Sequence, residues 1–258
     1  MAEITPLQLD IILLSGAFLY VLLVIGVSIM LKRGNIITSH SARKIVHLFA
    51  GFAVFIVPYL SLPFLALIIS ISVLIFTRFA GPKNIGKPVF EAIAEKDEQE
   101  KGYLSGPFSY ALAINILVFI FSFPSAVRYF YFPASSIMVM MISDTAAAWV
   151  GRKWGKHYIN LKYTKTIRTI EGSTTMFISA FLLSFFGFSF FGQWFPDNVQ
   201  EMEYFWITIL SLLMAANSTV VEIFSPSNID DLTVPITGCL LTFGLTVLLF
   251  PGSIGLYG

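Results

Sequence analysis

The chain has 258 residues, of which 56% are hydrophobic and only 12% are charged, and its formal net charge is +1. A soluble domain carries about 25% charged residues, so this composition excludes a water-soluble globular protein. The single cysteine, Cys239, excludes an internal disulfide. We expect a membrane partner and no nucleic acid.

Long apolar runs predict an all-α fold, a polytopic transmembrane helical bundle of about eight spans that forms a single integral membrane domain over residues 1–258. A helix needs roughly 20 apolar residues to cross a bilayer. The expected helices cover about 8–31, 45–60, 62–79, 104–123, 132–150, 172–193, 204–224 and 233–250. The first run has no basic region before it and no convincing cleavage site, so it is read as a retained span.

The second and third runs are short, and only Ser61-Leu62-Pro63 separates them. They predict a tight helical hairpin. No internal repeat is visible, which weakens any transporter reading built on inverted halves.

Positive charge predicts the orientation of the spans. With eight spans, fifteen of the 16 Lys and Arg residues fall on one side of the membrane, fourteen in loops at about 32–44, 80–103 and 151–171 and the fifteenth, Arg78, at the adjoining end of a run. Cytoplasmic loops carry such an excess. These loops and the acidic loop at about 225–232 are therefore expected in the cytoplasm, and both termini outside.

A stripe of polar residues opens the second run. Arg43, His47 and Gly51 share one helix face, and Lys44 lies three residues from His47. A histidine one turn inside the membrane edge needs a partner, so the set indicates a functional site. The structural alternative is snorkelling cations with a histidine bonded inside the bundle. The acidic segment 91–100 is expected to be a solvated amphipathic helix or flexible loop without chemistry.

Asp144 is the strongest single candidate for a functional residue. It lies about six residues before the end of its run, which places it roughly 9 Å below the following loop. A carboxylate at that depth must be paired, protonated or bound to a metal. We expect a metal or phosphate role, with a structural ion pair as the alternative.

The loop after Asp144 is dense in cations and bounded by glycines. Its cations are Arg152, Lys153, Lys156, Lys162, Lys165 and Arg168. Glycines free backbone N–H groups to face an anion, and Lys or Arg neutralise phosphates. Binding of anionic lipid headgroups is the alternative, preferred for Lys153, Lys156 and Lys162. Glu171-Gly172-Ser173 then opens the sixth helix, where Glu171 also suits a helix N-terminus.

A second set of acidic residues lies at the two ends of the last loop. Glu222 is followed by Asp230 and Asp231, with no cation between them. Adjacent carboxylates are ligands for hard cations, and Mg²⁺ takes one or two of them together with substrate phosphates. The alternative is a turn in which Asp231 caps a helix and Pro235 lies in its first turn.

In this order, these motifs resemble the polytopic family of CTP-dependent lipid-alcohol kinases, which includes dolichol kinase, phytol kinase and the CTP-using diacylglycerol kinase. The resemblance covers about residues 40–240. Two positions depart from the family's pattern: Ser143 stands where Gly is common, and Asp231 where Asn is common. The matching motifs are Arg43-Lys44-x-x-His47-x-x-x-Gly51, Asp144 with Gly151 and Gly155, Lys165 through Glu171-Gly172-Ser173, and Glu222 with Asp230-Asp231-Leu232-Thr233-Val234-Pro235.

The resemblance implies transfer of the γ-phosphate of CTP to the hydroxyl of a long-chain lipid alcohol, which would be polyprenol- or dolichol-like, phytol-like or diacylglycerol-like. It implies Mg²⁺ held by Asp144 with Asp230 or Asp231. His47 would be the base toward the hydroxyl, and Glu222 an alternative base or metal ligand. The implied nucleotide-binding residues are Arg43, Lys44, Lys165, Thr166, Arg168, Glu171, Gly172 and Ser173.

Two alternative functions stay open from the sequence. The Asp144 and Lys165–Ser173 motifs are also similar to CDP-lipid cytidylyltransferases, which use CTP and a lipid phosphate, but the Lys-Asp and His-Gly-Gly segment of that family does not follow Glu222. A transporter with an intramembrane acidic site is the third reading. Clustering of charge on one side and the lack of repeats disfavour it.

Overall fold

The structure, a computed structural model, describes residues 5–161, 167–196, 199–226 and 229–255. Contacts divide the chain into two compact units, residues 1–119 and 120–258. Each unit has helices and buried side chains of its own, and the single domain predicted over 1–258 stays a prediction.

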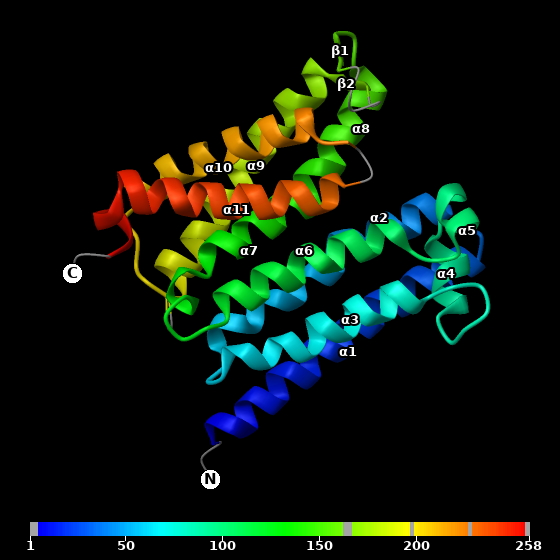
Figure 1. The fold of residues 1–258 in the computed structure, drawn as a ribbon, viewed down its shortest axis with the longest axis horizontal. Coiled ribbons are helices and arrows are strands. Elements are labelled where there is room, and N and C mark those ends of the chain that lie inside the picture. Colours follow the sequence, from blue (N-terminus) through cyan, green and yellow to red (C-terminus); the bar gives the residue numbers. More distant parts are fainter. Residues whose placement is uncertain (1–4, 162–166, 197–198, 227–228, 256–258) are drawn as a thin grey trace. The chain divides into compact units, whose positions relative to one another are not determined.

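All secondary-structure elements in the described part of the first unit are helices (Figure 1). A 3₁₀ segment, Gly51–Tyr59, continues α2, and a second one, Pro63–Leu65, begins the path into α3. Its helices are α1 (Pro6–Arg33), α2 (Ser39–Ala50), α3 (Ala66–Phe79), α4 (Lys87–Ile93), α5 (Lys96–Lys101) and α6 (Ser105–Phe121, whose last two residues belong to the second unit).

A buried carboxylate holds the predicted hairpin turn. Asp10, in the second turn of α1, is fully buried. It accepts hydrogen bonds from the backbone N–H and the hydroxyl of Ser61, at 2.7 and 2.6 Å, and from the backbone N–H of Leu62 at 3.1 Å. The turn would otherwise leave two N–H donors without partners inside an apolar region, where each unsatisfied group is unfavourable. Asp10 therefore has a structural role.

We expect Asp10→Ala to lower the free energy of unfolding by about 3 kcal/mol or more, because three hydrogen bonds to a charged group disappear and their donors stay buried. Thermal unfolding of the purified protein in detergent measures this. Asp97→Ala is the matched control: Asp97 is 61% exposed and pairs only with Lys101, so about 1 kcal/mol or less is expected. Equal effects from both variants would contradict the structural role of Asp10.

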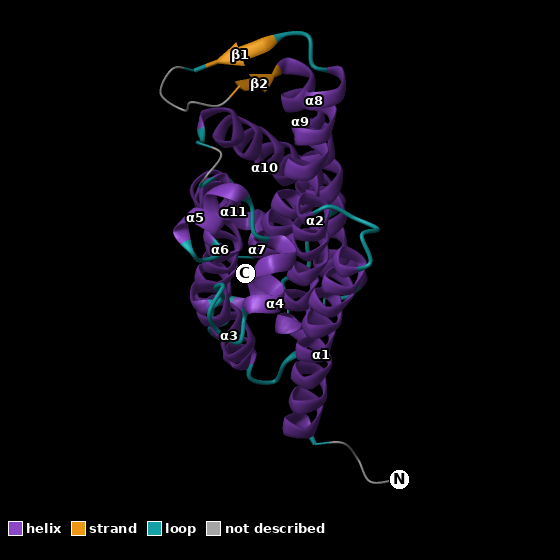
Figure 2. Ribbon diagram, turned by 90° about the vertical axis from the view of Figure 1, so that its right-hand side faces the viewer, coloured by secondary structure: helices purple, strands orange, loops and turns teal. Residues whose placement is uncertain are grey.

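The second unit adds a two-stranded hairpin to its helices. The strands pair antiparallel, with Tyr158 opposite Thr169 and Asn160 opposite Ile167. Figure 2 shows this hairpin beyond the ends of α8 and α9. The elements are α7 (Tyr131–Met138), a π-helical segment (Val139–Ser143), α8 (Asp144–Trp154), β1 (Tyr158–Asn160), β2 (Ile167–Thr169), α9 (Ile170–Ser189), a second π-helical segment (Phe190–Trp194), α10 (Tyr204–Phe224) and α11 (Asp230–Leu249), with short 3₁₀ turns at Val127–Tyr129 and Pro251–Ile254.

Aromatic side chains fill the core of the second unit. The ring of Phe132 on α7 packs edge-on against Phe188 of α9 and Phe243 of α11, with centroids 5.4 and 5.2 Å apart. The hydroxyl of Ser136 donates to the carbonyl of Pro235 at 2.7 Å, which ties α7 to α11. Because α7 runs through the π-helical segment into α8, this core fixes the start of α8.

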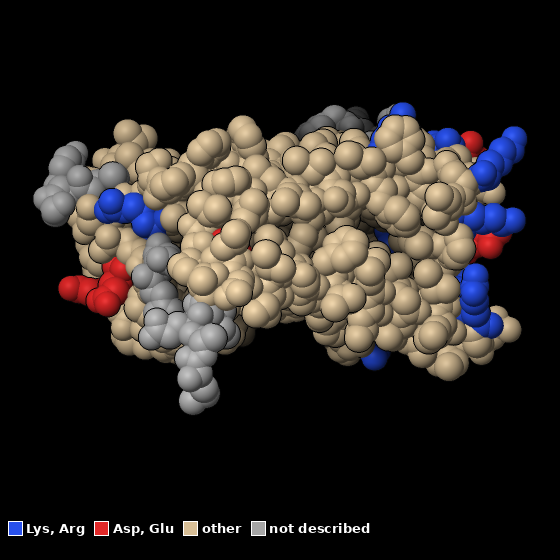
Figure 3. Space-filling view, turned by 90° about the horizontal axis from the view of Figure 1, so that it is seen from below, with Lys and Arg blue, Asp and Glu red and all other residues tan. Residues whose placement is uncertain are grey.

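The all-α membrane fold is confirmed. Within the described ranges, six helices are long and apolar enough to cross a membrane, and two shorter apolar helices, Pro63–Phe79 and Ser105–Phe121, match the remaining predicted runs. The protein is thus a multi-pass membrane protein, while the number of spans and the outward termini stay predictions. In Figure 3 most of the surface in view carries no charged side chain, and most of the Lys and Arg side chains lie at its right-hand side.

Candidate functional site

Arg168 joins two carboxyl groups from different helices. It lies on β2, and its two terminal nitrogens reach Glu222 Oε1 on α10 at 2.9 Å and Asp230 Oδ2 on α11 at 3.0 Å. All three side chains are largely buried, with 15, 4 and 12% of their surface exposed. A guanidinium presents a planar fork of donors, so it can hold two carboxylates at once.

Asp144 belongs to the same cluster. It is the first residue of α8, directly after the π-helical segment Val139–Ser143. It interacts electrostatically with Arg168, Glu222 and Asp230. π-Helical turns are rare and concentrate at functional sites, because the extra residue re-aims the side chains that follow. The acid cluster is defined here as Asp144, Glu222 and Asp230 around Arg168.

Three carboxyl groups share one guanidinium in the acid cluster. Burial lowers the pKa of Arg168, but Glu222, Asp230 and Asp144 raise it more, so the net shift is upward and the side chain stays charged. Oε2 of Glu222 is buried without a hydrogen-bond partner. Nε of Arg168 is likewise buried without a hydrogen-bond partner, so the cluster has an unused donor as well as an unused acceptor.

A polar cavity of about 380 Å³ adjoins the acid cluster. It is large enough for a small-molecule ligand. The first turn of α9 contributes Gly172 and the buried hydroxyl of Ser173, which has no partner. The N-terminus of a helix attracts anions, since its backbone N–H groups point outward. The walls of the cavity are formed by Ala147, Ala148, Gly151, Arg152, Tyr158, Ile167, Arg168, Thr169, Gly172, Ser173 and Glu222.

The glycines of the predicted loop serve helix packing. Gly151 lies inside α8, where an added Cβ would come within 2.8 Å of the Thr169 hydroxyl oxygen. A Cβ on Gly172 would lie 3.0 Å from the carbonyl oxygen of Ala147 and from the same hydroxyl. Thr169 itself caps α9 by accepting from the N–H of Gly172 at 3.1 Å. Their absent side chains let α8 and α9 approach closely, which brings the first turn of α9 beside the cavity.

The remaining predicted site residues of this region do not line the cavity as the structure describes it. Glu171 bonds the ring of His157, with Oε1 and Nδ1 2.7 Å apart, and is absent from the cavity walls. Lys165 and Thr166 lie outside the described residues. Asp231 is half-buried in the first turn of α11. The suggested capping of that helix by Asp231 is wrong, because the cap residue is Ile229 and no side chain caps the end.

Arg43 lies in the first unit and pairs with a residue that sequence patterns missed. Its guanidinium is 3.1 Å from Oε2 of Glu98, which is 1% exposed. Oε1 of Glu98 accepts from the N–H of Gly106 at 2.8 Å. The solvated amphipathic helix or loop expected at 91–100 is therefore wrong at Glu98, whose charged side chain is buried. Its ion-pair partner is 55 positions away in the sequence, which no local pattern reveals.

His47 and Lys44 also lie in the first unit. The buried His47 ring packs on Tyr110 with centroids 4.3 Å apart, and the Tyr110 hydroxyl donates to the His47 carbonyl at 2.9 Å. Lys44 is half-buried on α2. Whether these residues share a site with the acid cluster stays a prediction.

In the second unit, sequence reasoning missed Tyr158 and did not place Arg152 in the site. Both line the cavity. Arg152 had a visible signal in its position between Gly151 and Gly155, whereas the short strand that carries Tyr158 has none. Among all described residues, no three His, Cys, Asp or Glu side chains are arranged as metal ligands.

No family model and no solved structure matches the chain. Among curated proteins, one from Synechocystis named phytol kinase is 28% identical over 223 residues, which is 83% of this chain and 83% of the relative. This similarity supports the resemblance to the polytopic lipid-alcohol kinase family. The aligned length includes most of the chain, so the similarity is not confined to one motif.

Proposed function

We propose that the protein transfers the γ-phosphoryl group of CTP to the hydroxyl of a long-chain lipid alcohol at the cytoplasmic face of the membrane. The hydroxyl oxygen attacks the γ-phosphorus, the bond to the β-phosphate oxygen breaks, and CDP leaves. The hydroxyl proton passes to a base. The observation that carries the proposal is the acid cluster beside a polar cavity in a chain similar to a phytol kinase.

The cavity suits a polyphosphate for two reasons. Arg152 and Arg168 on its walls supply positive charge, and the first turn of α9 supplies N–H groups and the Ser173 hydroxyl. Phosphoryl transfer depends on alignment and charge neutralisation more than on covalent help from the protein. Lys44 and Lys165 are proposed as further phosphate ligands. The choice of cytidine as the nucleoside is implied by the family resemblance.

The acid cluster also fits Mg²⁺. Mg²⁺ binds through one or two carboxylates and completes its shell with water and substrate phosphates, so three protein ligands are not needed. Asp144 and Asp230 would hold the ion, with Asp231 the alternative to Asp230. The unpartnered Oε2 of Glu222 is a spare acceptor in the same cluster. When bound, the ion would neutralise charge on the triphosphate.

Two groups are candidates for the base. His47 carries an imidazole, the side chain that most often serves as a general base, and is buried against Tyr110. Glu222 has a free acceptor oxygen at the acid cluster. Replacing His47 and Glu222 in separate variants distinguishes the two candidates, since loss of the base lowers kcat with little change in KM for the nucleotide.

Labelled CTP tests the reaction directly. Purified protein is incubated with Mg²⁺, a panel of lipid alcohols and CTP labelled at the γ- or the α-phosphate. We expect γ-label and no α-label in the lipid product.

The reverse pattern, α-label entering a lipid phosphate, would identify a cytidylyltransferase. A protein that moves a solute across vesicles and transfers neither label would be a transporter. Either result overturns the proposal.

A further inference from the structure

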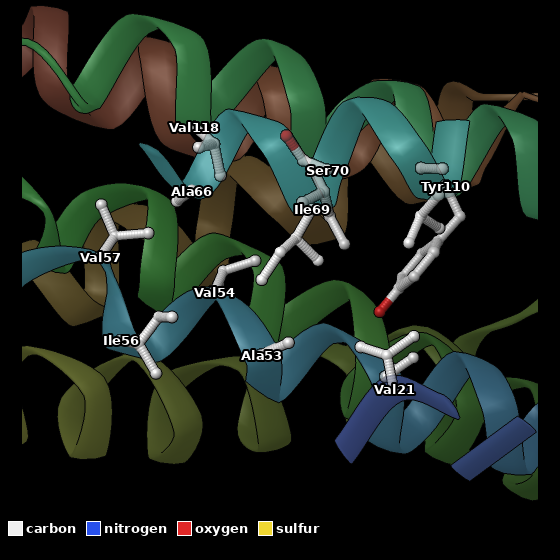
Figure 4. A pocket seen from close by; sticks show the side chains of 14 residues that line it. Val21, Ala53, Val54, Ile56, Val57, Ala66, Ile69, Ser70, Tyr110 and Val118 are labelled. Carbon is white, nitrogen blue, oxygen red and sulfur yellow. The ribbon is translucent and has the colours of Figure 1, made fainter. Parts of the chain in front are cut away.

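The first unit contains an apolar cavity that the acid cluster does not explain. It lies among α1, α2 with its 3₁₀ continuation, α3 and α6 (Figure 4). Twelve of its fourteen wall residues are aliphatic, and only Ser70 and Tyr110 carry a polar side-chain atom. The aliphatic wall residues are Val21, Ala50, Ala53, Val54, Ile56, Val57, Ala66, Ile69, Val73, Ala111, Ile114 and Val118.

We propose that this cavity binds the hydrocarbon chain of the lipid alcohol, with the hydroxyl end toward Tyr110 and the chain end toward Val57 and Val118. The proposal rests on the proposed function, because it names the site of the acceptor substrate. It assigns the acceptor's chain to the first unit and the nucleotide to the second.

The lining selects a hydrocarbon. Ser70 already bonds on both sides, since its hydroxyl donates to the carbonyl of Leu67 at 3.3 Å and accepts from Asn115 at 3.0 Å. An apolar cavity of this kind stays dry and binds apolar molecules. Its volume is about 60 Å³, which is narrow and suits a segment of a chain instead of a headgroup. Four alanines on its walls leave this space open.

The cavity has a direction. From Ala50 to Val57 its wall follows seven residues of helix, roughly 10–14 Å at the rise of α- and 3₁₀-helices. Figure 4 shows Tyr110 at one end, with its hydroxyl directed toward Val21 and Ala53, and Val57 and Val118 at the other end.

Tyr110 supplies the polar end. Its hydroxyl is the polar group at this end of the wall, and it donates to the His47 carbonyl at 2.9 Å. The stacked His47 ring lies at the same end. A substrate hydroxyl placed there would meet the residue proposed as its base.

Photolabelling tests the location without turnover. The full chain in lipid vesicles is irradiated with a long-chain alcohol carrying a diazirine near the end of its chain. We expect labelling within residues 50–57 and 66–73, and competition by the unlabelled alcohol. Equal labelling of these segments by a diazirine phospholipid would assign the cavity to bulk lipid, and labelling elsewhere would place the chain elsewhere. Both outcomes overturn the proposal.

Adjacent isoleucines on α3 give a matched pair. Ile69 lines the cavity, whereas Ile68 is 61% exposed. Ile69→Trp should raise KM for the long-chain alcohol about tenfold or more, because methylene groups lose their apolar site, and leave KM for CTP unchanged. Ile68→Trp should change neither constant. Ala53→Phe fills the cavity from another helix and is used if Ile69→Trp does not fold.

Wild-type KM for the alcohol in both cavity-filling variants would overturn the inference. Failure of the proposed function looks different. In that case the alcohol still labels the cavity while no γ-phosphate reaches it.

Discussion

Asp144→Asn is expected to reduce kcat by about 10³-fold or more while leaving the protein folded in detergent. Asparagine removes a charge that the proposed metal and phosphate chemistry requires, and losses of this size are typical of groups that act on the transferring charge. The fold should be retained, because asparagine has nearly the same size and shape as aspartate and remains polar.

Product formation from γ-labelled CTP and thermal unfolding in detergent measure the two effects. Glu203→Gln is the matched control, since Glu203 is an exposed acid at the opposite end of α10 from Glu222 and bonds no part of the acid cluster. Its activity should stay within about twofold of wild type. An active Asp144→Asn variant would remove Asp144 from the mechanism.

The sequence predicted the helices well because hydropathy and length decide them locally. The run expected at 204–224 is α10, Tyr204–Phe224, and Glu222 lies on it as expected. The wrong predictions of secondary structure concern polar segments between the apolar runs. The loop expected at 151–171 is in fact the last turns of α8 followed by a strand hairpin, because neither Gly151 nor a short polar strand has a periodic signal.

The candidate residues were predictable, but their partners were not. An acid inside an apolar run marks Asp144 and Glu222 whatever they contact, since burial of a carboxylate requires a reason. The pairing of Arg168 with Asp230 joins residues 62 positions apart. Asp10 and its turn at Ser61 are 51 positions apart. Such pairs depend on how helices pack, which a single sequence does not encode in any local pattern.

The largest effect on stability is expected from Arg168→Met. Its removal leaves Glu222 and Asp230 buried without the cation that now lies within 3.0 Å of both. Breaking a buried ion pair by removing one partner lowers the free energy of unfolding by about 3–5 kcal/mol. Thermal unfolding in detergent measures it. Lys153→Met is the control, because Lys153 is exposed and contacts only the faces of Trp149 and Trp154, so about 1 kcal/mol or less is expected.

A second set of changes isolates the cause. Adding Glu222→Gln and Asp230→Asn to Arg168→Met removes the uncompensated carboxyl groups, so stability should return toward wild type while activity stays absent. If the triple variant were no more stable than Arg168→Met, lost packing of the long Arg168 side chain would be the cause instead of lost charge.

Arg168→Met also tests the metal site in the absence of turnover. In the wild type the guanidinium already serves as counter-ion to Glu222 and Asp230, so Mg²⁺ must compete with it for these oxygens. Without Arg168, a bound cation can compensate Glu222 and Asp230 in its place, and a ligand that binds only the folded state stabilises it. We therefore expect Mg²⁺ to raise the unfolding temperature of Arg168→Met more than that of the wild type, and to have no such effect on the triple variant. Equal shifts in all three proteins would mean that Mg²⁺ does not bind at the acid cluster.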